Sequence, residues 1–407
     1  MLGPGLITGA ADDDPSGVST YSTAGAAFGF ALLWTAPFTL PLMTAVQLMC
    51  ARVGMVTGQG LAGVLRAHYP RWLLWLSCAL LLVANTVNIG ADLGAMAAVA
   101  EMLTGLPAPA LVPFFAFVIL GLLVFETYPV IARVFKWLTL VLLAYVAAAF
   151  LARPDWSAVA RATVLPQLRL DRAYLTTLVA IFGTTISPYL FFWQAAEEVE
   201  EEIARGRVTV GQRRGASKRA MRAATLDVVV GMSVSVLIFY FIVLTTAATL
   251  HAGGQHDIRT AEDAARALRP LAGDFAALLF SLGIVGTGLL GVSVLTGSAA
   301  LAVAEAAGWP GGMSERPLAA RRFYAVMAVS MVAGMAMAFS GADAIRMLFW
   351  AAVLNGVLAP PLIVVVLVVC NNRELMGEHR NGVLLNLLGT LAAAVMGACA
   401  LALALPA

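Results

Sequence analysis

The sequence predicts an all-α protein that crosses a membrane many times, and two observations lead to this prediction. Of its 407 residues, 61% are hydrophobic and only 12% are charged, whereas soluble domains are about 45–50% apolar and about 25% charged. The apolar residues also gather in runs that are long enough to span a bilayer, which takes roughly 20 residues per helix. A net charge of +2 gives no electrostatic footprint for nucleic acid, so that class of partner is excluded.

Eleven apolar runs are expected to form the transmembrane helices. They cover residues 2–28, 31–51, 73–103, 109–125, 130–152, 173–196, 223–250, 274–307, 318–340, 344–370 and 383–405. The segments between them carry the charges and turn residues, for example Arg153, Pro154 and Asp155. We expect a first block of five helices in residues 1–152, a second in 153–370, and an additional helix in 371–407.

The basic residues predict how the helices are oriented. If the amino terminus is cytoplasmic, most of the 25 Lys and Arg residues fall in loops on the cytoplasmic side, as the positive-inside rule requires. We therefore expect a cytoplasmic amino terminus and an external carboxyl terminus in a prokaryotic inner membrane. The expected partner is the lipid bilayer, with no obligate protein partner.

The first apolar run is interrupted at residues 12–17, where Asp12, Asp13 and Asp14 precede Pro15, Ser16 and Gly17. An aspartate at the centre of a transmembrane helix costs about 2.5–3.5 kcal/mol. Non-helical backbone at this depth is tolerated only where protein or a water-filled cavity surrounds it. The run therefore predicts a broken helix whose break faces a site inside the protein.

The sixth run is interrupted in the same way at residues 183–189, where Pro188 removes a backbone donor. A proline kink alone would explain this feature. However, the two interruptions begin corresponding segments of the two five-helix blocks, and paired broken helices are a pointer to a transporter site at the bilayer midplane. Because each block has an odd number of helices, the second is expected to be inverted relative to the first.

Four motifs resemble those of the NRAMP family of metal-ion transporters. They are G-P-G-L at residues 3–6 with D-P-S-G at 14–17, A-R-V-G-M-V-T-G at 51–58, A-D-L-G at 91–94, and S-P-Y-L at 187–190. The resemblance covers essentially the whole chain. It implies eleven helices in the LeuT-type 5+5 inverted-repeat fold with helices 1 and 6 broken. It also implies a secondary active transporter that works by alternating access, and not an enzyme.

The chain departs from the family pattern at the site itself. In the family, an Asp and an Asn of helix 1 and a Met of helix 6 ligate a partly dehydrated transition metal. Asp14 matches the first of these, whereas Gly17 and Ser187 stand at the Asn and Met positions, and Tyr189 stands where the family has a His. A thioether is the soft ligand that suits transition metals better than hard cations. Proton-coupled manganese or iron transport of the usual kind is therefore not expected.

Two interpretations of the substrate remain, and we favour a small oxyanion such as bicarbonate, coupled to Na⁺. Half-helix N-termini present free N–H groups to anions, and the hydroxyls of Thr184, Thr185 and Ser187 would add donors. Carboxylates and carbonyls near Asp12, Asp13 and Asp14 would then hold the coupling Na⁺, and no other cofactor is expected. The resemblance also implies a bicarbonate-carrying branch.

The alternative is a divalent metal cation, with Mg²⁺ favoured over Mn²⁺ or Fe²⁺. Mg²⁺ dehydrates reluctantly and is often held by one or two carboxylates and waters, so Asp14 would be its metal ligand, helped by hydroxyls and freed carbonyls. An ion channel is a third reading.

The expected site residues fall into two sets. The substrate set is Asp14, Ser16, Gly17, Thr184, Thr185, Ser187 and Tyr189, and the coupling-ion or ion-path set is Asp12, Asp13, Asn85, Asn88, Asp92 and Asn355. Asn85, Asn88 and Asp92 share one helix face, and an acid inside the membrane marks a functional site, whereas packing between helices explains the asparagines equally well. The glutamates of residues 197–202 are interpreted as a solvated helix end with basic counter-charges nearby.

Overall fold

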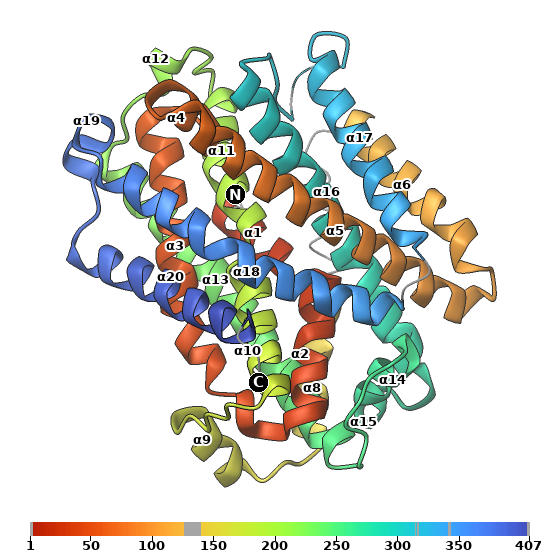
Figure 1. The fold of residues 1–407 in the computed structure, drawn as a ribbon. Coiled ribbons are helices and arrows are strands. Elements are labelled where there is room, and N and C mark those ends of the chain that lie inside the picture. The colour runs from red at the N-terminus through yellow and green to blue at the C-terminus, as the bar shows by residue number, and fades with distance from the viewer. Residues whose placement is uncertain (1–2, 126–139, 314, 316, 341–342, 405–407) are drawn as a thin grey trace.

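All of the secondary structure in the described part of the chain is helical (Figure 1). We describe a computed structural model over residues 3–125, 140–313, 315, 317–340 and 343–404. The long helices are α3 (Thr35–Thr57), α5 (Arg71–Thr104), α6 (Ala108–Phe125), α13 (Lys218–Thr246), α16 (Ala276–Ala307), α17 (Arg321–Ala338), α18 (Ala344–Asn371) and α20 (Val383–Ala404). The half-helices are α1 (Pro4–Asp12), α2 (Pro15–Phe28), α10 (Arg172–Thr185) and α11 (Pro188–Ala204).

Shorter helices lie between these segments. They are α4 (Leu61–His68), α8 (Ala144–Leu151), α9 (Trp156–Val164), α12 (Val210–Arg213), α14 (Ala261–Ala265), α15 (Arg269–Ala272) and α19 (Arg373–Met376). Among the described residues, eight helical segments are long and apolar enough to cross a membrane. The predicted fifth span, 130–152, lies partly outside the described residues, so the predicted count of eleven stays a prediction.

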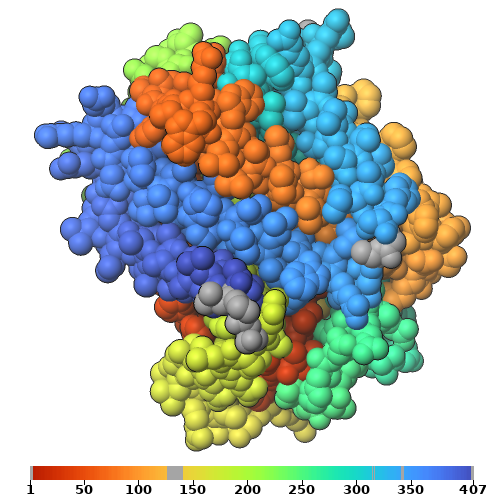
Figure 2. Space-filling view, viewed as in Figure 1, coloured from red at the N-terminus to blue at the C-terminus, as the bar shows by residue number. Residues whose placement is uncertain are grey.

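The connecting segments collect at two opposite ends of the helical bundle. Figure 1 shows α4, α12 and α19 at one end and α9, α14 and α15 at the other. In the space-filling view, α18 and α20 form a continuous blue surface across the middle of the face that Figure 2 presents. The segments that carry α4, α12 and α19 contain more basic residues than those that carry α9, α14 and α15, so the charge asymmetry corresponds to the two ends of the bundle.

Both predicted breaks are present, although each is shorter than expected. The first consists of Asp13 and Asp14, between α1 and α2, and the second of Ile186 and Ser187, between α10 and α11. Each new half-helix begins at a proline, Pro15 or Pro188, because a proline at the first helical position has the right φ and needs no hydrogen bond to its missing N–H.

The expected boundaries of the breaks need a correction for this reason. Ser16 and Gly17 lie in the first turn of α2 rather than in the break. Thr184 and Thr185 lie in the last turn of α10. The prolines that were expected only to interrupt these helices also start the following half-helices, and this confines each break to two residues.

Glycines let the half-helices approach their neighbours closely. A Cβ on Gly9 of α1 would collide with the backbone of Gly231 in α13, and one on Gly231 would collide with the backbone of Gly5. Likewise a Cβ on Gly183 of α10 would collide with the backbone of α18 at Gly356. Small residues at helix crossings bring backbones together in this way within membranes. These contacts fix both breaks in the interior of the bundle.

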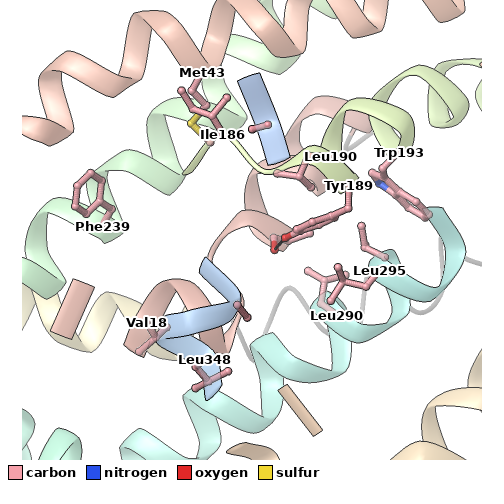
Figure 3. Close-up of a cluster of buried hydrophobic side chains, with 14 of the residues drawn as sticks. Val18, Met43, Ile186, Tyr189, Leu190, Trp193, Phe239, Leu290, Leu295 and Leu348 are labelled. Atoms are coloured by element: carbon pink, nitrogen blue, oxygen red, sulfur yellow. Dashed lines mark hydrogen bonds between the residues drawn. The ribbon is translucent and has the colours of Figure 1, made fainter. Parts of the chain in front are cut away.

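Large apolar side chains close the space around the two breaks (Figure 3). Leu190 and Trp193 of α11 and Leu290 of α16 lie on one side, and Phe239 of α13 lies further away. Each of these four side chains is buried. Because water is excluded here, charges at the breaks interact more strongly than they would in solvent.

Candidate functional site

The carboxylate of Asp14 caps the half-helix α2 and bridges the two breaks. Its Oδ1 accepts hydrogen bonds from the hydroxyl of Ser16 at 2.7 Å and from the backbone N–H of Gly17 at 2.9 Å. Its Oδ2 lies 3.3 Å from the Tyr189 hydroxyl, which also donates to the carbonyl of Ala11 at 3.0 Å. An N-cap of this kind satisfies a free donor of the helix, and it fixes the carboxylate between α1, α2 and α11.

Asp92 of α5 brings a second carboxylate to the same place. It is fully buried, no side chain among the described residues donates a hydrogen bond to it, and the backbone N–H of Ser16 in the first turn of α2 faces it. A Cβ placed on Gly291 of α16 would lie 2.9 Å from Cβ of Asp14 and 3.6 Å from Oδ2 of Asp92. Both acids therefore lie close to α16 at Gly291, where even one added carbon atom would crowd Asp14. A single backbone donor does not compensate a buried carboxylate, so a cation beside Asp92 would offset its charge.

Asp12 and Asp13 contact α13 rather than α5. The hydroxyl of Ser235 donates to Oδ2 of Asp12 at 2.7 Å and lies 3.4 Å from Oδ1 of Asp13. The other oxygen of each acid, Oδ1 of Asp12 and Oδ2 of Asp13, has no hydrogen-bond partner among the described residues. The sequence did not single out Ser235, because a serine in an apolar run is common where helices pack.

Two of the three hydroxyls expected at the second break point into their own helix. Thr185 donates to the carbonyl of Ile181 at 2.8 Å, and Ser187 lies 2.8 Å from the carbonyls of both Gly183 and Thr184. Bonds of this type to a carbonyl three or four residues earlier are a common use of Ser and Thr in helices. Their protons are therefore not aimed at a ligand, and only their lone pairs remain.

Thr184 is the exception, because its hydroxyl faces the first break. Its Oγ1 lies 3.4 Å from the hydroxyl of Ser16, and it would lie 3.3 Å from a Cβ on Gly17. The structure therefore brings together Asp14, Ser16, Gly17, Thr184 and Tyr189 from the expected substrate set, with Asp92 from the other set.

The asparagines of the ion-path set hold helices together. Asn88 of α5 and Asn355 of α18 exchange two amide hydrogen bonds, at 2.9 and 3.2 Å. Asn85 donates to the carbonyl of Leu295 and to the hydroxyl of Ser298 in α16, both at 2.8 Å. All three asparagines are buried. These contacts are those of polar side chains that pack helices in a membrane.

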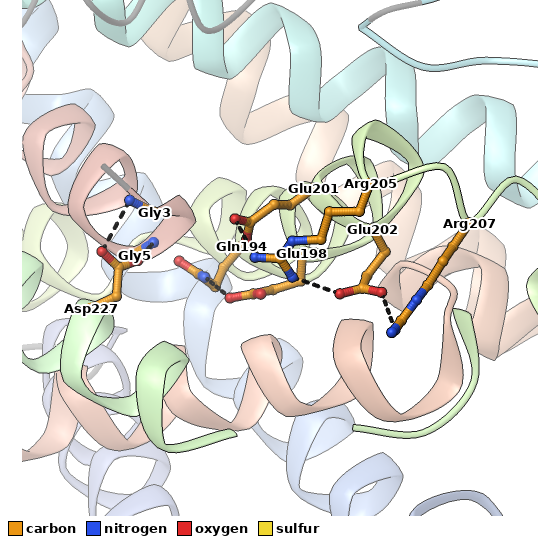
Figure 4. Close-up of polar contacts among 9 residues, drawn as sticks. All are labelled: Gly3, Gly5, Gln194, Glu198, Glu201, Glu202, Arg205, Arg207 and Asp227. Carbon is orange, nitrogen blue, oxygen red and sulfur yellow. Dashed lines mark hydrogen bonds and ion pairs between the residues drawn. The ribbon is translucent and has the colours of Figure 1, made fainter. Parts of the chain in front are cut away.

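The glutamates of α11 correct the interpretation of a solvated helix end (Figure 4). Glu197, Glu198 and Glu202 are only 7%, 4% and 8% exposed. Glu198 accepts a hydrogen bond from Gln194 at 3.0 Å, and Arg205 and Arg207 pair with Glu202. The expected counter-charges are thus present at Glu202, but α11 is covered by its neighbours over most of its length, because it packs on α3, α16 and α1.

An acidic side chain also anchors the start of the first half-helix. Asp227 of α13 accepts hydrogen bonds from the backbone N–H of Gly3 at 3.2 Å and of Gly5 at 2.6 Å (Figure 4). These are donors that the first turn of a helix leaves free. The amino-terminal end of α1 is therefore tied to α13.

The buried charges around the first break are of one sign. The buried polar residues of the described chain include Asp12, Asp13, Asp14 and Asp92 but no Lys, Arg or His. No three His, Cys, Asp or Glu side chains among the residues searched lie close enough together to share one metal ion. An ion at the break would thus be held by one or two carboxylates together with hydroxyl and carbonyl oxygens.

The sequence matches one known family over nearly its whole length. Residues 5–406 match the family described as natural resistance-associated macrophage protein-like, or Nramp. The chain belongs to the Nramp family. This confirms the resemblance drawn from the four motifs, and it makes the protein an integral membrane protein and a secondary transporter.

Two curated relatives agree with the family assignment. The chain is 28% identical to the divalent metal cation transporter MntH of Yersinia enterocolitica, over 96% of this chain and 91% of that protein. It is also 28% identical to MntH of Pectobacterium carotovorum, over 94% of this chain and 88% of that one.

Among solved structures, the manganese transporter of Eremococcus coleocola superposes with a TM-score of 0.76 at 18% identity, covering 98% of this chain and 85% of that one. Mhp1, a nucleobase-cation-symport-1 family transporter, gives 0.56 at 14% identity, covering 99% of this chain and 90% of that one. These likenesses confirm the predicted LeuT-type fold.

Proposed function

We propose that this Nramp protein transports a divalent metal cation held between Asp14 and Asp92. The observation that carries the proposal is the pair of buried carboxylates beside Gly291, with no Lys, Arg or His among the described buried residues to compensate their charge. A buried charge without a partner costs several kcal/mol or more. A cation between the two acids would offset this cost, and an anion would increase it.

The hydroxyl groups also support a cation over the oxyanion that the sequence favoured. The oxyanion interpretation needs Thr185 and Ser187 as donors, yet both hydroxyls donate to carbonyls of α10. What they offer is oxygen lone pairs, which are ligands for a cation. Relatives named divalent metal cation transporters agree with this choice.

The ligands available favour Mg²⁺ over softer metals. Carboxylate, carbonyl and water oxygens suit Mg²⁺, Ca²⁺ and Mn²⁺, whereas thioether and thiolate sulfur select softer metals. Ser187, at the second position of the second break, supplies oxygen in place of the sulfur that the motif has in the family. We therefore place Mg²⁺ first and Mn²⁺ second as the substrate.

Uptake into proteoliposomes tests the proposal. Purified protein is reconstituted, and the uptake of Mg²⁺, Mn²⁺ and labelled bicarbonate is measured for the wild type, Asp92→Asn and Asp274→Asn. Asp274 is an exposed acid between α15 and α16, so its variant controls for a general loss of negative charge.

We expect saturable Mg²⁺ uptake that Asp92→Asn reduces and Asp274→Asn leaves unchanged. Bicarbonate uptake without Mg²⁺ or Mn²⁺ uptake would overturn the proposal in favour of the oxyanion. Uptake that follows voltage without saturation, at the rates of a pore, would point to a channel.

The orientation follows from the same proposal. We infer that the end of the bundle with α4, α12 and α19 faces the cytoplasm, because these segments hold more basic residues than those with α9, α14 and α15 at the other end. Cysteines introduced in α12 and α9 should then react with a membrane-impermeant reagent from opposite sides.

A further inference from the structure

We infer that Asp12, Asp13 and Ser235 form a second ion site, separate from the one at Asp14 and Asp92, which binds a small monovalent cation with Na⁺ as its physiological probe. The inference rests on the proposed function, since it assigns the coupling ion of a metal transporter. Its first support is charge. If Asp14 and Asp92 compensate a divalent ion, the negative charges of Asp12 and Asp13 remain uncompensated, because the described buried residues include no Lys, Arg or His.

The contacts of these acids are arranged as a ligand set. Ser235 of α13 donates to Oδ2 of Asp12 at 2.7 Å, and it lies 3.4 Å from Oδ1 of Asp13. This leaves one oxygen of each acid, Oδ1 of Asp12 and Oδ2 of Asp13, unpartnered at residues that are 0% and 1% exposed. Two orphaned carboxylate oxygens and one hydroxyl oxygen that retains a lone pair thus lie at the same crossing of α1 and α13.

The backbone supports a cation at this crossing. Asp12 is the last residue of α1 and Asp13 follows it, so the carbonyls of the last turn of α1 lack helical partners. The carboxyl end of a helix carries partial negative charge and favours cations. In transporters with broken helices, unwound carbonyls and the ends of half-helices are where Na⁺ is coordinated.

The tight packing explains why the ion is small and singly charged. One turn before Ser235, Gly231 touches the backbone of α1 at Gly5 and Gly9. One turn after it, Phe239 stacks on Tyr21 of α2, with ring centroids 4.3 Å apart. We expect helices in such contact to exclude the water shell of an ion held between them. Mg²⁺ keeps several of its waters, whereas Na⁺ can be held by oxygens of the protein.

The location of this site links binding of Na⁺ to binding of the metal. Asp12 and Asp13 belong to the α1 side of the first break, and Asp14 belongs to the α2 side. Binding of Na⁺ would hold α1 against α13 with Asp14 in its capping position. Loading of the Na⁺ site and loading of the metal site are therefore linked through two adjacent residues.

Direct binding of ²²Na⁺ to the purified protein tests the site without any transport. The variants are Asp13→Asn, Ser235→Ala and the control Ser233→Ala. Ser233 lies on the same helix but is exposed, and its hydroxyl donates to the carbonyl of Val229. We expect Ser235→Ala to weaken Na⁺ binding by about fivefold, the effect of losing one neutral polar ligand, Asp13→Asn to weaken it further, and Ser233→Ala to leave it unchanged.

Transport assays then separate the failure of this inference from the failure of the proposed function. Mg²⁺ uptake by the wild type should increase with an inward Na⁺ gradient, and Ser235→Ala should lose this increase while retaining downhill Mg²⁺ flux. Mg²⁺ uptake that ignores Na⁺, together with no ²²Na⁺ binding, overturns the second site and leaves the proposed function standing. Specific ²²Na⁺ binding that depends on Ser235, with no transport of any divalent ion, overturns the proposed function and leaves the site standing.

Discussion

The two helix breaks use the same backbone arrangement but differ in chemistry. Each consists of two residues and is followed by a proline that starts a new half-helix. The first has the acids Asp13 and Asp14, with a carboxylate capping α2, whereas the second has Ile186 and Ser187, and Ser187 makes no side-chain cap of α11. The first break therefore supplies negative charge, whereas the second has only uncharged side chains, and the hydroxyls of Thr185 and Ser187 there bond to carbonyls of α10.

This difference shows that the symmetry of an inverted repeat does not extend to its ligands. The fold needs both breaks, because half-helices from both blocks meet at the site. An ion needs compensating charge from only one of them, provided that a continuous helix such as α5 contributes a second acid. The predictions below test this division, beginning with the largest expected effect.

Asp14→Ala should remove most of the transport. Breaking a buried charge arrangement costs about 3–5 kcal/mol, which corresponds to a loss of more than about 100-fold in apparent affinity for the metal. Mg²⁺ uptake in proteoliposomes measures the loss, with Asp274→Ala as the control. Wild-type uptake by Asp14→Ala would show that the first break does not supply the charge.

Gly291→Ala should weaken metal binding by crowding the two acids that lie beside it. The new Cβ would lie 2.9 Å from Cβ of Asp14, so a neighbour must move, and inserted methyl groups in packed interiors cost about 1–3 kcal/mol. The apparent KM for Mg²⁺ should rise about tenfold or more. Gly121→Ala is the matched control, since a Cβ there has no neighbour within 4 Å. An unchanged KM would place the ion elsewhere.

Ser187→Met should change which metal is preferred while leaving the fold intact. A thioether at the second break adds a soft ligand beside Asp14, so the ratio of Cd²⁺ to Mg²⁺ uptake should rise by about tenfold, the effect of one added ligand contact of about 1.4 kcal/mol. Competition of Cd²⁺ with Mg²⁺ uptake measures this ratio. If Ser187→Met and Ser187→Ala gave the same ratio, the second break would not face the ion.

Asn88→Ala should have the smallest effect on transport and a measurable effect on stability. It removes the reciprocal amide pair with Asn355 that joins α5 and α18. Interhelical hydrogen bonds of this kind contribute about 0.6–1.7 kcal/mol, so thermal unfolding in detergent should move to a slightly lower temperature. The double variant with Asn355→Ala should add little further loss. Abolished transport with normal stability would instead make Asn88 a ligand.

The sequence predicted the fold and the two breaks because these depend on local signals. Hydrophobic runs, three acids in succession and two prolines are visible in any window of 20 residues. The buried position of Asp92 was predicted for the same reason, since an acid inside a span must face the protein interior.

Side-chain directions could not be predicted, because they depend on rotamers and on partners far away in the chain. Thr185 and Ser187 donate to carbonyls of α10, whereas the oxyanion interpretation expected them to donate to the substrate. Ser235 contacts Asp12 across 223 residues, and Gly291 matters through the Cβ that it lacks. Glu197 and Glu198 are buried because neighbouring helices pack over α11. The spacing of apolar residues within α11 does not reveal which other helices pack on it.

The tie between Asp227 and the amino-terminal end of α1 has a consequence for how often the protein opens at that end. Hydrogen bonds to a charged group contribute about 1.5–3 kcal/mol each, and α1 would have to give up two of them, from Gly3 and Gly5, to swing away from α13. Together the two bonds favour the tied arrangement by about 3–6 kcal/mol, which leaves the untied conformation populated at less than about 1%. Most molecules are then closed at this end of α1. The rate at which the ion is released there depends on how often the hydrogen bonds from Gly3 and Gly5 to Asp227 break.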